Sequence, residues 1–197
     1  FTLRPLSSLL YRWEWSDWGT GGIDWSFMSV STTPTGYAPI GDLIYQGYLG
    51  DNVGIDPARA WNVQVLFVRN DRPDVARPCT DYIDIGTLSA DTTSKMWRPT
   101  CSDPNFIGVG DVCLRGTSKP IIGKYFCVHR KYLIDAGKNA FLLSTEDGVT
   151  CYRTIPSTNI FRRGDPQVFG LRDDANLQAC CTGSGTMCEL WTKGSTS

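Results

Sequence analysis

Apolar and polar residues alternate along short stretches of the chain, and glycine, proline and aspartate interrupt them. The best alternation runs from Trp61 to Phe67, where every second residue is apolar, so these side chains would share one face of a strand. With 20 glycines and 11 prolines, the pattern predicts short strands joined by tight turns. No apolar run reaches the roughly 18 residues that a membrane-spanning helix needs, so none is expected.

One motif recurs along the chain. It consists of an aromatic residue, two further residues, a β-branched residue, a Gly-Asp pair and an aliphatic residue, and it occupies residues 37–43 and 106–112. Residues 160–165 form a third, less similar copy that ends in the same Gly-Asp pair. Glycine adopts positive φ and aspartate bonds nearby backbone amides, so the pair has a structural explanation as a turn or bulge. We therefore expect the motif to belong to the scaffold.

Other elements accompany each copy in the same order. A strand rich in Asp, Gly and Thr comes before the motif, and an apolar strand that ends in arginine follows it, at residues 65–70, 126–131 and 168–173. Each unit thus offers about four short strands. Three such units would form three sheets that bury their inner faces around a common axis.

The repeat therefore predicts an all-β fold, a disulfide-stabilised β-prism of three antiparallel sheets related by a pseudo-threefold axis. The prism would be one domain covering residues 1–197, with units at about residues 11–70, 71–131 and 132–197. A β-trefoil is the rival architecture, but its repeats are shorter than the spacing of these Gly-Asp pairs. A propeller with four strands in each of six or seven blades would need a longer chain.

Composition narrows the class of protein further. Hydrophobic residues make up 41% of the chain and charged residues 20%, which is a globular balance. The net charge of −1 argues against a nucleic-acid partner, because that needs clustered Lys and Arg. Among the 20 acidic residues only Glu14, Glu146 and Glu189 are glutamate, so aspartate, which favours turns, dominates and little helix is expected.

Cysteine is concentrated in the second and third units. An even number of cysteines in such a chain indicates disulfides and a secreted, extracellular protein. A zinc site is the alternative, but the sequence contains no CxxC and His129 is its single histidine. The eight candidates for disulfides are Cys79, Cys101, Cys113, Cys127, Cys151, Cys180, Cys181 and Cys188.

The cysteine spacing suggests a pairing scheme. Cys113 and Cys127 are expected in neighbouring strands and would bridge them, while Cys79 and Cys101 would tie the start of the second unit to its next strand. Disulfides among the remaining four cysteines would stabilise the third unit and the tail. Each closure would stabilise the fold by about 2–4 kcal/mol. The first residue is Phe1, which we interpret as the result of signal or propeptide removal.

These elements resemble the family related to vacuolar protein sorting-associated protein 62. The resemblance rests on residues 15–27 with Ile40-Gly-Asp, and on residues 96–99 with Val109-Gly-Asp and Cys127-Val-His. The multivesicular body-associated β-prism and the C-terminal β-prism of perforin-like proteins are similar in architecture. The resemblance implies a β-prism and, by analogy with those two groups, a membrane- or lipid-binding role, and it brings no catalytic residues.

Candidates for chemistry are weak. His129 is the single possible general base, and a lone histidine in a repeated strand is more often a packed or rim residue. Aspartate is the turn residue throughout, so no pair of carboxylates stands out for glycoside hydrolysis. The polar stretch 50–56 could hold calcium but also fits a plain turn. The sequence predicts no enzyme, no catalytic residue, no metal and no cofactor.

Binding signals are better, because aromatic side chains and small basic clusters recur together. Tyr125, Tyr132 and Trp191 are further aromatic candidates, and residues 129–131 with Lys124 could form a basic patch. Core aromatics and a solvated basic face would explain the same pattern. The chain is expected to bind a membrane lipid or a glycan surface, or else to assemble with other copies as a structural protein. The expected ligand-binding residues are Tyr45, Tyr48, Trp61, Arg162 and Arg163.

Overall fold

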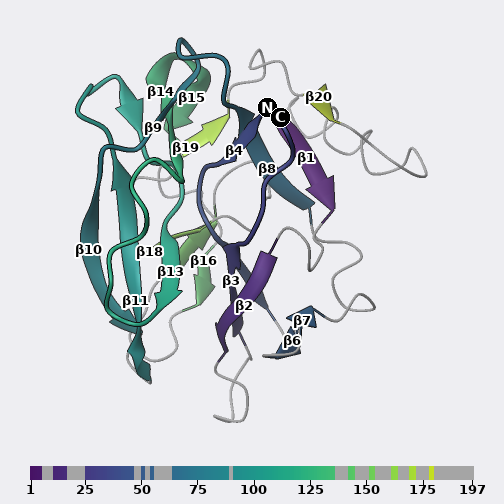
Figure 1. Cartoon of the computed structure of the whole chain (residues 1–197), viewed down its shortest axis with the longest axis vertical. Coiled ribbons are helices and arrows are strands. Elements are labelled where there is room, and N and C mark those ends of the chain that lie inside the picture. The colour runs from purple at the N-terminus through teal and green to yellow at the C-terminus, as the bar shows by residue number, and fades with distance from the viewer. Residues whose placement is uncertain are drawn as a thin grey trace.

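The computed structural model is built almost wholly from short strands (Figure 1). It describes residues 1–5, 11–16, 25–46, 50–51, 54–55, 64–88, 91–135, 142–144, 151–153, 161–163, 169–171 and 178–179. Within these residues the single helical element is the one-turn 3-10 helix η1 (Arg130–Tyr132). No helix of the described chain is long and apolar enough to cross a bilayer.

Three sheets share one construction, in which a hairpin is joined by a third, later strand. The first contains β2 (Tyr11–Ser16), β3 (Trp25–Val30) and β5 (Leu43–Gln46). The second contains β10 (Asp81–Leu88), β11 (Asp91–Thr100) and β13 (Val112–Arg115). The third contains β16 (Leu142–Ser144), β17 (Cys151–Arg153) and β18 (Phe161–Arg163). Each hairpin contains a register shift of the kind that a bulge produces, and the hairpin of β10 and β11 contains two.

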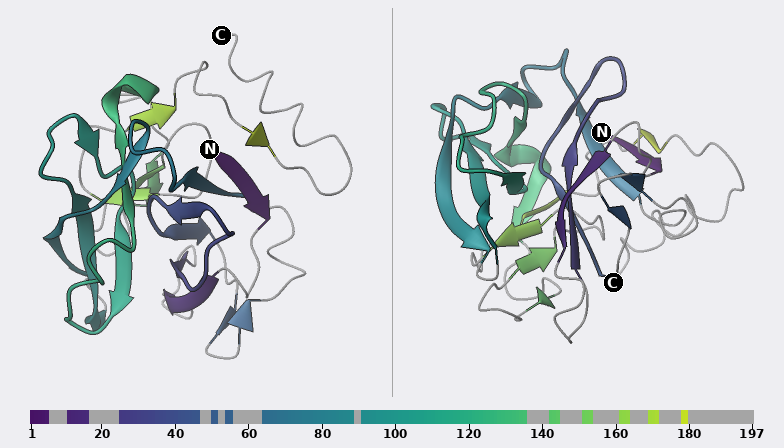
Figure 2. Two further views of the ribbon diagram at one scale, coloured as in Figure 1. Left: turned by 45° about the horizontal axis from the view of Figure 1, so that its top comes forward. Right: turned by 60° about the horizontal axis from the view of Figure 1, so that its bottom comes forward.

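The other strands form a second set of sheets. The order β20-β1-β8-β4 joins Gln178–Ala179, Thr2–Pro5, Gln64–Arg69 and Tyr37–Pro39. The order β12-β14-β9 joins Phe106–Ile107, Phe126–His129 and Ala76–Pro78. A pair joins β15 (Leu133–Asp135) to β19 (Phe169–Leu171), and β6 (Gly50–Asp51) pairs with β7 (Gly54–Ile55) as a small hairpin. Figure 2 shows the purple to blue strands of the first unit beside the teal strands of the second.

The division of each unit over two sheets differs from the expected three sheets of four strands. Strand β4 ends at Pro39 and β5 begins at Leu43, yet they belong to different sheets. Strands β12 and β13 are separated in the same way by residues 108–111. The Gly-Asp motif therefore lies at a corner where the chain leaves one sheet and enters the next. In the first two units the corner interrupts the ladder, so one long sheet cannot form there.

The first two corners pair with each other across the repeat. The Asp42 amide donates to the Asp111 carbonyl oxygen at 2.8 Å, and the Gly110 amide donates to the Ile40 carbonyl oxygen at 3.0 Å. One of these hydrogen bonds runs from the first corner to the second, and the other runs back. Together they fix the first two units against each other through the motif itself. Gly41 and Gly110 do not adopt positive φ, which among the described glycines occurs at Gly36, Gly86, Gly116 and Gly123.

The Asp42 carboxylate is fully buried and extends this contact. Its oxygens accept hydrogen bonds from the Val30 amide at 3.2 Å and the Cys113 amide at 2.9 Å. The Tyr125 hydroxyl donates to it as well. Aspartate bonding to backbone amides is what the sequence suggests, but one of these amides lies 71 residues away rather than in the same turn. The first Gly-Asp pair thus holds two repeats together.

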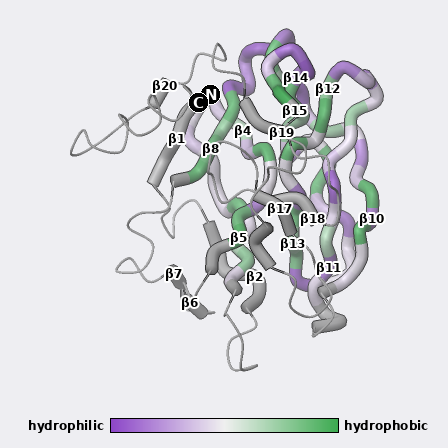
Figure 3. The backbone as a smooth tube through the Cα atoms, turned by 180° about the vertical axis from the view of Figure 1, so that it is seen from behind, coloured by the Kyte–Doolittle hydropathy of each residue, from purple (hydrophilic) through white to green (hydrophobic). Residues whose placement is uncertain are grey.

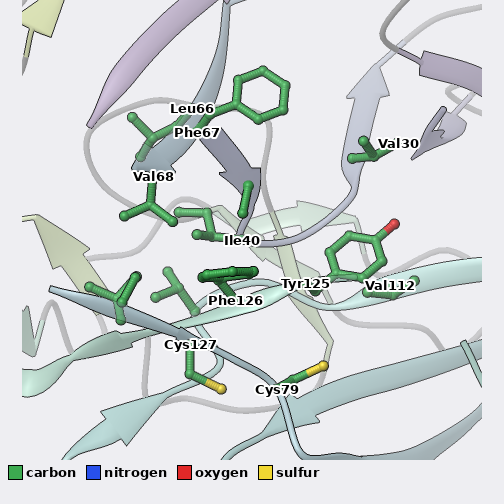
Figure 4. Packing of buried hydrophobic residues seen from close by; sticks show 14 of the residues in the cluster. Val30, Ile40, Leu66, Phe67, Val68, Cys79, Val112, Tyr125, Phe126 and Cys127 are labelled. Atoms are coloured by element: carbon green, nitrogen blue, oxygen red, sulfur yellow. The ribbon is translucent and has the colours of Figure 1, made fainter. Parts of the chain in front are cut away.

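A hydrophobic core surrounds these corners (Figure 4). Its largest fully buried side chains come from both units and include Phe67, Ile40, Met28 and Tyr125. Residues 65–68 of β8 are all buried, because β8 lies between β1 and β4 and both faces of that sheet are covered. The expected one-sided alternation is therefore wrong for this part of the strand. Trp61 and Val63 lie outside the described residues.

Candidate functional site

The site that we single out is a rim at one end of the β12-β14-β9 sheet, near the end of β14 in Figure 1. Three segments meet there. The His129 amide donates to the Val75 carbonyl oxygen and the Arg130 amide donates to the Asn105 carbonyl oxygen, both at 2.8 Å. Figure 3 colours the backbone around this end of β14 as hydrophilic. We define the rim by Arg72, Asp74, Arg77, Asp103, Phe106, His129, Arg130, Lys131 and Tyr132.

Strand register places the central rim residues side by side. Phe106 on β12 lies opposite His129 on β14, while Cys127 on β14 lies opposite Arg77 on β9. Because alternate residues of a strand share a face, Arg77, Phe106 and His129 all project to the same side of this sheet. The rim is therefore assembled by pairings between segments that are far apart in the sequence.

Aromatic rings support the cations of the rim. The Arg77 guanidinium lies over the Phe106 ring at 4.3 Å from its centroid, and the Lys131 ammonium lies over the Tyr132 ring at 4.9 Å. The His129 ring meets the Phe106 ring edge-on, with centroids 4.9 Å apart. Edge-on rings and stacked cations each stabilise such an arrangement by about 0.5–1 kcal/mol. The cations are thus held in place and still reach the surface.

His129 has a structural task in this arrangement. Its Nδ1 accepts a hydrogen bond from the Lys131 amide at 3.1 Å, which caps the start of η1. Its ring also faces the Tyr132 ring edge-on, at 6.4 Å between centroids. A packed histidine at a rim is what the sequence favours over a general base. In the described part of the chain, no group of three or more His, Cys, Asp or Glu residues could hold a metal ion.

Carboxylates neutralise some of the rim cations but not all of them. Arg77 pairs with Asp103 at 3.0 Å, and Arg72 pairs with Asp74 at 2.9 Å. The pKa of Asp103 lies below its ordinary value, chiefly because the Asn105 amide donates to it. The Arg130 guanidinium instead donates to the Pro104 carbonyl oxygen at 2.8 Å.

Two positive charges remain exposed at the rim as a result. Within the residues that the structure describes, no carboxylate lies within ion-pair distance of Arg130 or Lys131. Both side chains belong to exposed residues. The rim therefore presents uncompensated positive charge next to aromatic rings, which suits an anionic surface.

The expected ligand-binding residues are not among those that define the rim. Tyr45 lies on β5, and Arg162 and Arg163 lie on β18, opposite Tyr152 and Cys151. Only their backbone is described, and Tyr48 and Trp61 lie outside the described residues. These five positions stay a prediction.

Sequence reasoning found part of the rim and misjudged other residues. It singled out residues 129–131 and Tyr132, which do lie there. Tyr125 is fully buried and Lys124 donates to the Val30 carbonyl oxygen at 2.6 Å, so neither belongs to the rim. Arg77 and Phe106 were missed. No local signal marks them, because they reach the site through pairing with β14.

The cysteines also differ from the expected scheme. Cys79, Cys101, Cys113 and Cys127 form no disulfide in the structure. The assignment of Cys113 and Cys127 to neighbouring strands is wrong, because β13 and β14 belong to different sheets. The Cys101 Sγ donates to the Pro78 carbonyl oxygen at 3.3 Å, and Cys127 is the main cause of the lowered pKa of Cys101, which the expected Cys79–Cys101 bridge did not anticipate. Cys151 is described by its backbone alone, and Cys180, Cys181 and Cys188 lie outside the described residues.

Comparison with known proteins supports the fold. No family model matches the chain, and no curated protein matches it. The structure is similar to GNIP1Aa from Chromobacterium piscinae, with a TM-score of 0.55 at 15% sequence identity. The match covers 82% of this chain and 32% of that chain, so the chain spans about a third of the length of GNIP1Aa. The fold is therefore β-prism-like, with several small antiparallel sheets.

Proposed function

We propose that this chain is a non-catalytic binding module that attaches to anionic membrane surfaces through the rim. The observation that carries the proposal is the pair of exposed cations, Arg130 and Lys131, that lack a carboxylate partner within the described chain. They lie next to Tyr132 and to the stacked pair of Arg77 and Phe106. Cations near an anionic leaflet contribute about 1 kcal/mol each, and aromatic rings favour the headgroup region.

The β-prism-like fold lends support at the level of architecture. The resemblance to the vacuolar protein sorting-associated protein 62 family, which no family model bears out, stays a prediction. The proposal places the protein outside the cell, since its eight cysteines suit an oxidising compartment. A glycan surface is the competing target of the same kind of module. It would be read by hydrogen bonds more than by net charge, so salt would weaken binding to a neutral glycan much less.

Vesicle flotation tests the proposal. The chain should float with vesicles of phosphatidylcholine and phosphatidylserine and stay at the bottom with phosphatidylcholine alone. The double variant R130Q/K131Q should bind about 30-fold more weakly, because losing two contributions of about 1 kcal/mol each corresponds to that factor. Added salt should weaken binding of the original chain and have less effect on the double variant.

A matched control removes two cations elsewhere. Lys95 and Lys119 pair with Asp84 and Asp81, away from the rim, so K95Q/K119Q changes the net charge equally without touching the rim. This control should bind like the original chain. Equal loss in both double variants, or binding that does not depend on phosphatidylserine, contradicts the proposal. Binding to glycans without binding to either vesicle would transfer the function to a glycan surface.

A second candidate function is assembly with other copies of the chain. It is favoured by Ile121 and Ile122, which are 77% and 57% exposed and stand together in one turn. A hydrogen bond holds this turn in place, because the Tyr82 hydroxyl donates to the Ile121 carbonyl oxygen at 2.9 Å. Adjacent exposed apolar residues suit the centre of a contact between proteins. Sedimentation of the chain without vesicles, run beside the flotation, would show oligomers if this candidate is correct.

A further inference from the structure

Three cysteines from separate strands gather beneath the rim. Cys127 lies on β14 opposite Arg77. Cys79 directly follows β9 and lies two residues after Arg77. The Cys79 amide donates to the Tyr125 carbonyl oxygen at 2.8 Å, which continues the same ladder. Residues two apart on paired strands share a face, so Cys79 and Cys127 face the same side. Figure 4 shows both side chains at the border of the core.

Cys101 approaches this pair from the end of β11. Its Sγ donates to the Pro78 carbonyl oxygen at 3.3 Å, and Pro78 stands between Arg77 and Cys79. The Thr80 amide donates to the Thr100 carbonyl oxygen at 2.8 Å, which anchors the residue directly before Cys101. Pro78 pairs with Phe126, the neighbour of Cys127, so the contact with Pro78 brings Cys101 close to Cys127. The two thiols also shift each other's pKa.

The two thiols differ in exposure and in acidity. Cys101 is partly exposed, whereas Cys127 is fully buried. Interaction with the Cys127 thiol lowers the pKa of Cys101, and the Arg77 guanidinium adds to this effect. The same interaction, together with burial, raises the pKa of Cys127. Thiolates attack disulfides, so the exposed Cys101 suits the attacking position and Cys127 the resolving one.

We infer that Cys101 and Cys127 form an intramolecular disulfide by exchange with a small-molecule disulfide of the glutathione class. The Cys101 thiolate attacks one sulfur of the oxidised compound, whose sulfur–sulfur bond breaks, and the released thiolate takes up a proton. Cys127 then loses its proton to solvent and attacks the Cys101 sulfur, releasing the second small thiol. The two cysteines are oxidised by two electrons in total, and the small disulfide is reduced to two thiols.

The bond would join the loop that follows β11 to β14. That loop carries Asp103, the partner of Arg77, and it accepts the Arg130 amide at Asn105. Oxidation would therefore fasten the segment on which the rim depends. Reduction would leave it held by hydrogen bonds and by the Arg77–Asp103 ion pair.

Peptide mapping without reduction tests the inference on the full chain. The folded protein is incubated with oxidised glutathione, its remaining thiols are blocked by alkylation, and the digest is analysed by mass spectrometry. The expected product links the peptides of Cys101 and Cys127. In C127S the reaction should stop after its first step and leave one glutathione on Cys101. C113S is the matched control, since Cys113 is buried on another sheet, and it should give the Cys101–Cys127 link.

A second readout does not depend on the variants. Oxidation of the original chain and of C113S should raise the urea midpoint of unfolding, and C101S should show no such rise. A bond from Cys101 or Cys127 to Cys79, or to any other cysteine, overturns the inference. So does a folded chain in which Cys101 and Cys127 both remain open to alkylation after the incubation. Neither readout involves vesicles, so the inference stands or falls apart from the proposed membrane binding.

Discussion

The buried carboxylate of Asp42 gives the most specific prediction about stability. Burial raises the pKa of Asp42 from its ordinary value of 3.8 to about 7, against the opposing hydrogen bonds from Tyr125, Cys113 and Val30. The unfolded chain has the ordinary value, so the folded state binds this proton more tightly. The contribution of protonated Asp42 to stability is complete below pH 3.8 and is lost as the pH rises through about 7.

The size of the effect follows from the shift. A difference of about three pKa units corresponds to about 4 kcal/mol, at 1.36 kcal/mol for each unit. The free energy of unfolding should therefore fall by up to about this amount between about pH 4 and pH 8. Exposed carboxylates act in another window. The pKa values of Asp71, Asp74 and Asp81 are lowered by their cationic partners, so their contribution is lost only as the pH falls below 3.8.

Urea unfolding followed by tryptophan fluorescence across this range measures the effect. D42N should flatten the profile, because the amide does not titrate, although it faces the Cys113 amide with a donor and lowers stability overall. Y125F removes a donor that favours the charged form, so its loss of stability should extend to higher pH. A profile that rises or stays level from pH 4 to 7 refutes the reasoning, since the three donors would then outweigh burial.

Two further substitutions test the packing of the corners and are read from urea midpoints. G108A should destabilise the fold by about 3 kcal/mol, because an added Cβ would lie 2.0 Å from the Pro99 carbonyl oxygen. G36A should cost about 1 kcal/mol, because the added Cβ meets no atom within 4 Å but the φ of Gly36 is +80°. Equal costs for the two variants would contradict the predicted clash. R98M should cost about 3 kcal/mol, because it removes the bidentate partner of the buried Asp111, at 2.8 and 2.9 Å. R69M breaks the exposed pair of Arg69 and Asp71 and should cost much less. A similar loss in both variants would argue against the buried pair.

The repeat made much of the fold accessible from the sequence. The Gly-Asp pairs and the strands around them recur in order, and the structure repeats a hairpin plus a third strand three times. What the pattern could not give is the position of the corners. A run such as residues 37–46 looks like one extended segment, and only the partners of β4 and β5 show that it serves two sheets. Partners are long-range contacts, and the alternation of side chains does not encode them.

The rim was accessible only in part for the same reason. Arg130 and Lys131 are consecutive, so their charge is visible in the sequence. The absence of a nearby carboxylate in the described structure is not visible, because Asp74 and Asp103 are committed to Arg72 and Arg77 by the folding of two loops. The approach of Cys101 to Cys127 likewise depends on how β11 ends against β9. Spacing between cysteines carries no information about that approach.

The first two Gly-Asp pairs show how one motif can serve two physical roles. Asp111 is neutralised by the Arg98 guanidinium, which keeps its charge within the protein as an ion pair. Asp42 lies at the equivalent position, but its partners are two amides and a hydroxyl, so its charge is balanced by dipoles. Dipoles compensate burial less completely than a guanidinium does. Because the two corners are also joined by reciprocal backbone hydrogen bonds, ionisation of Asp42 acts directly on the contact between the first and second units.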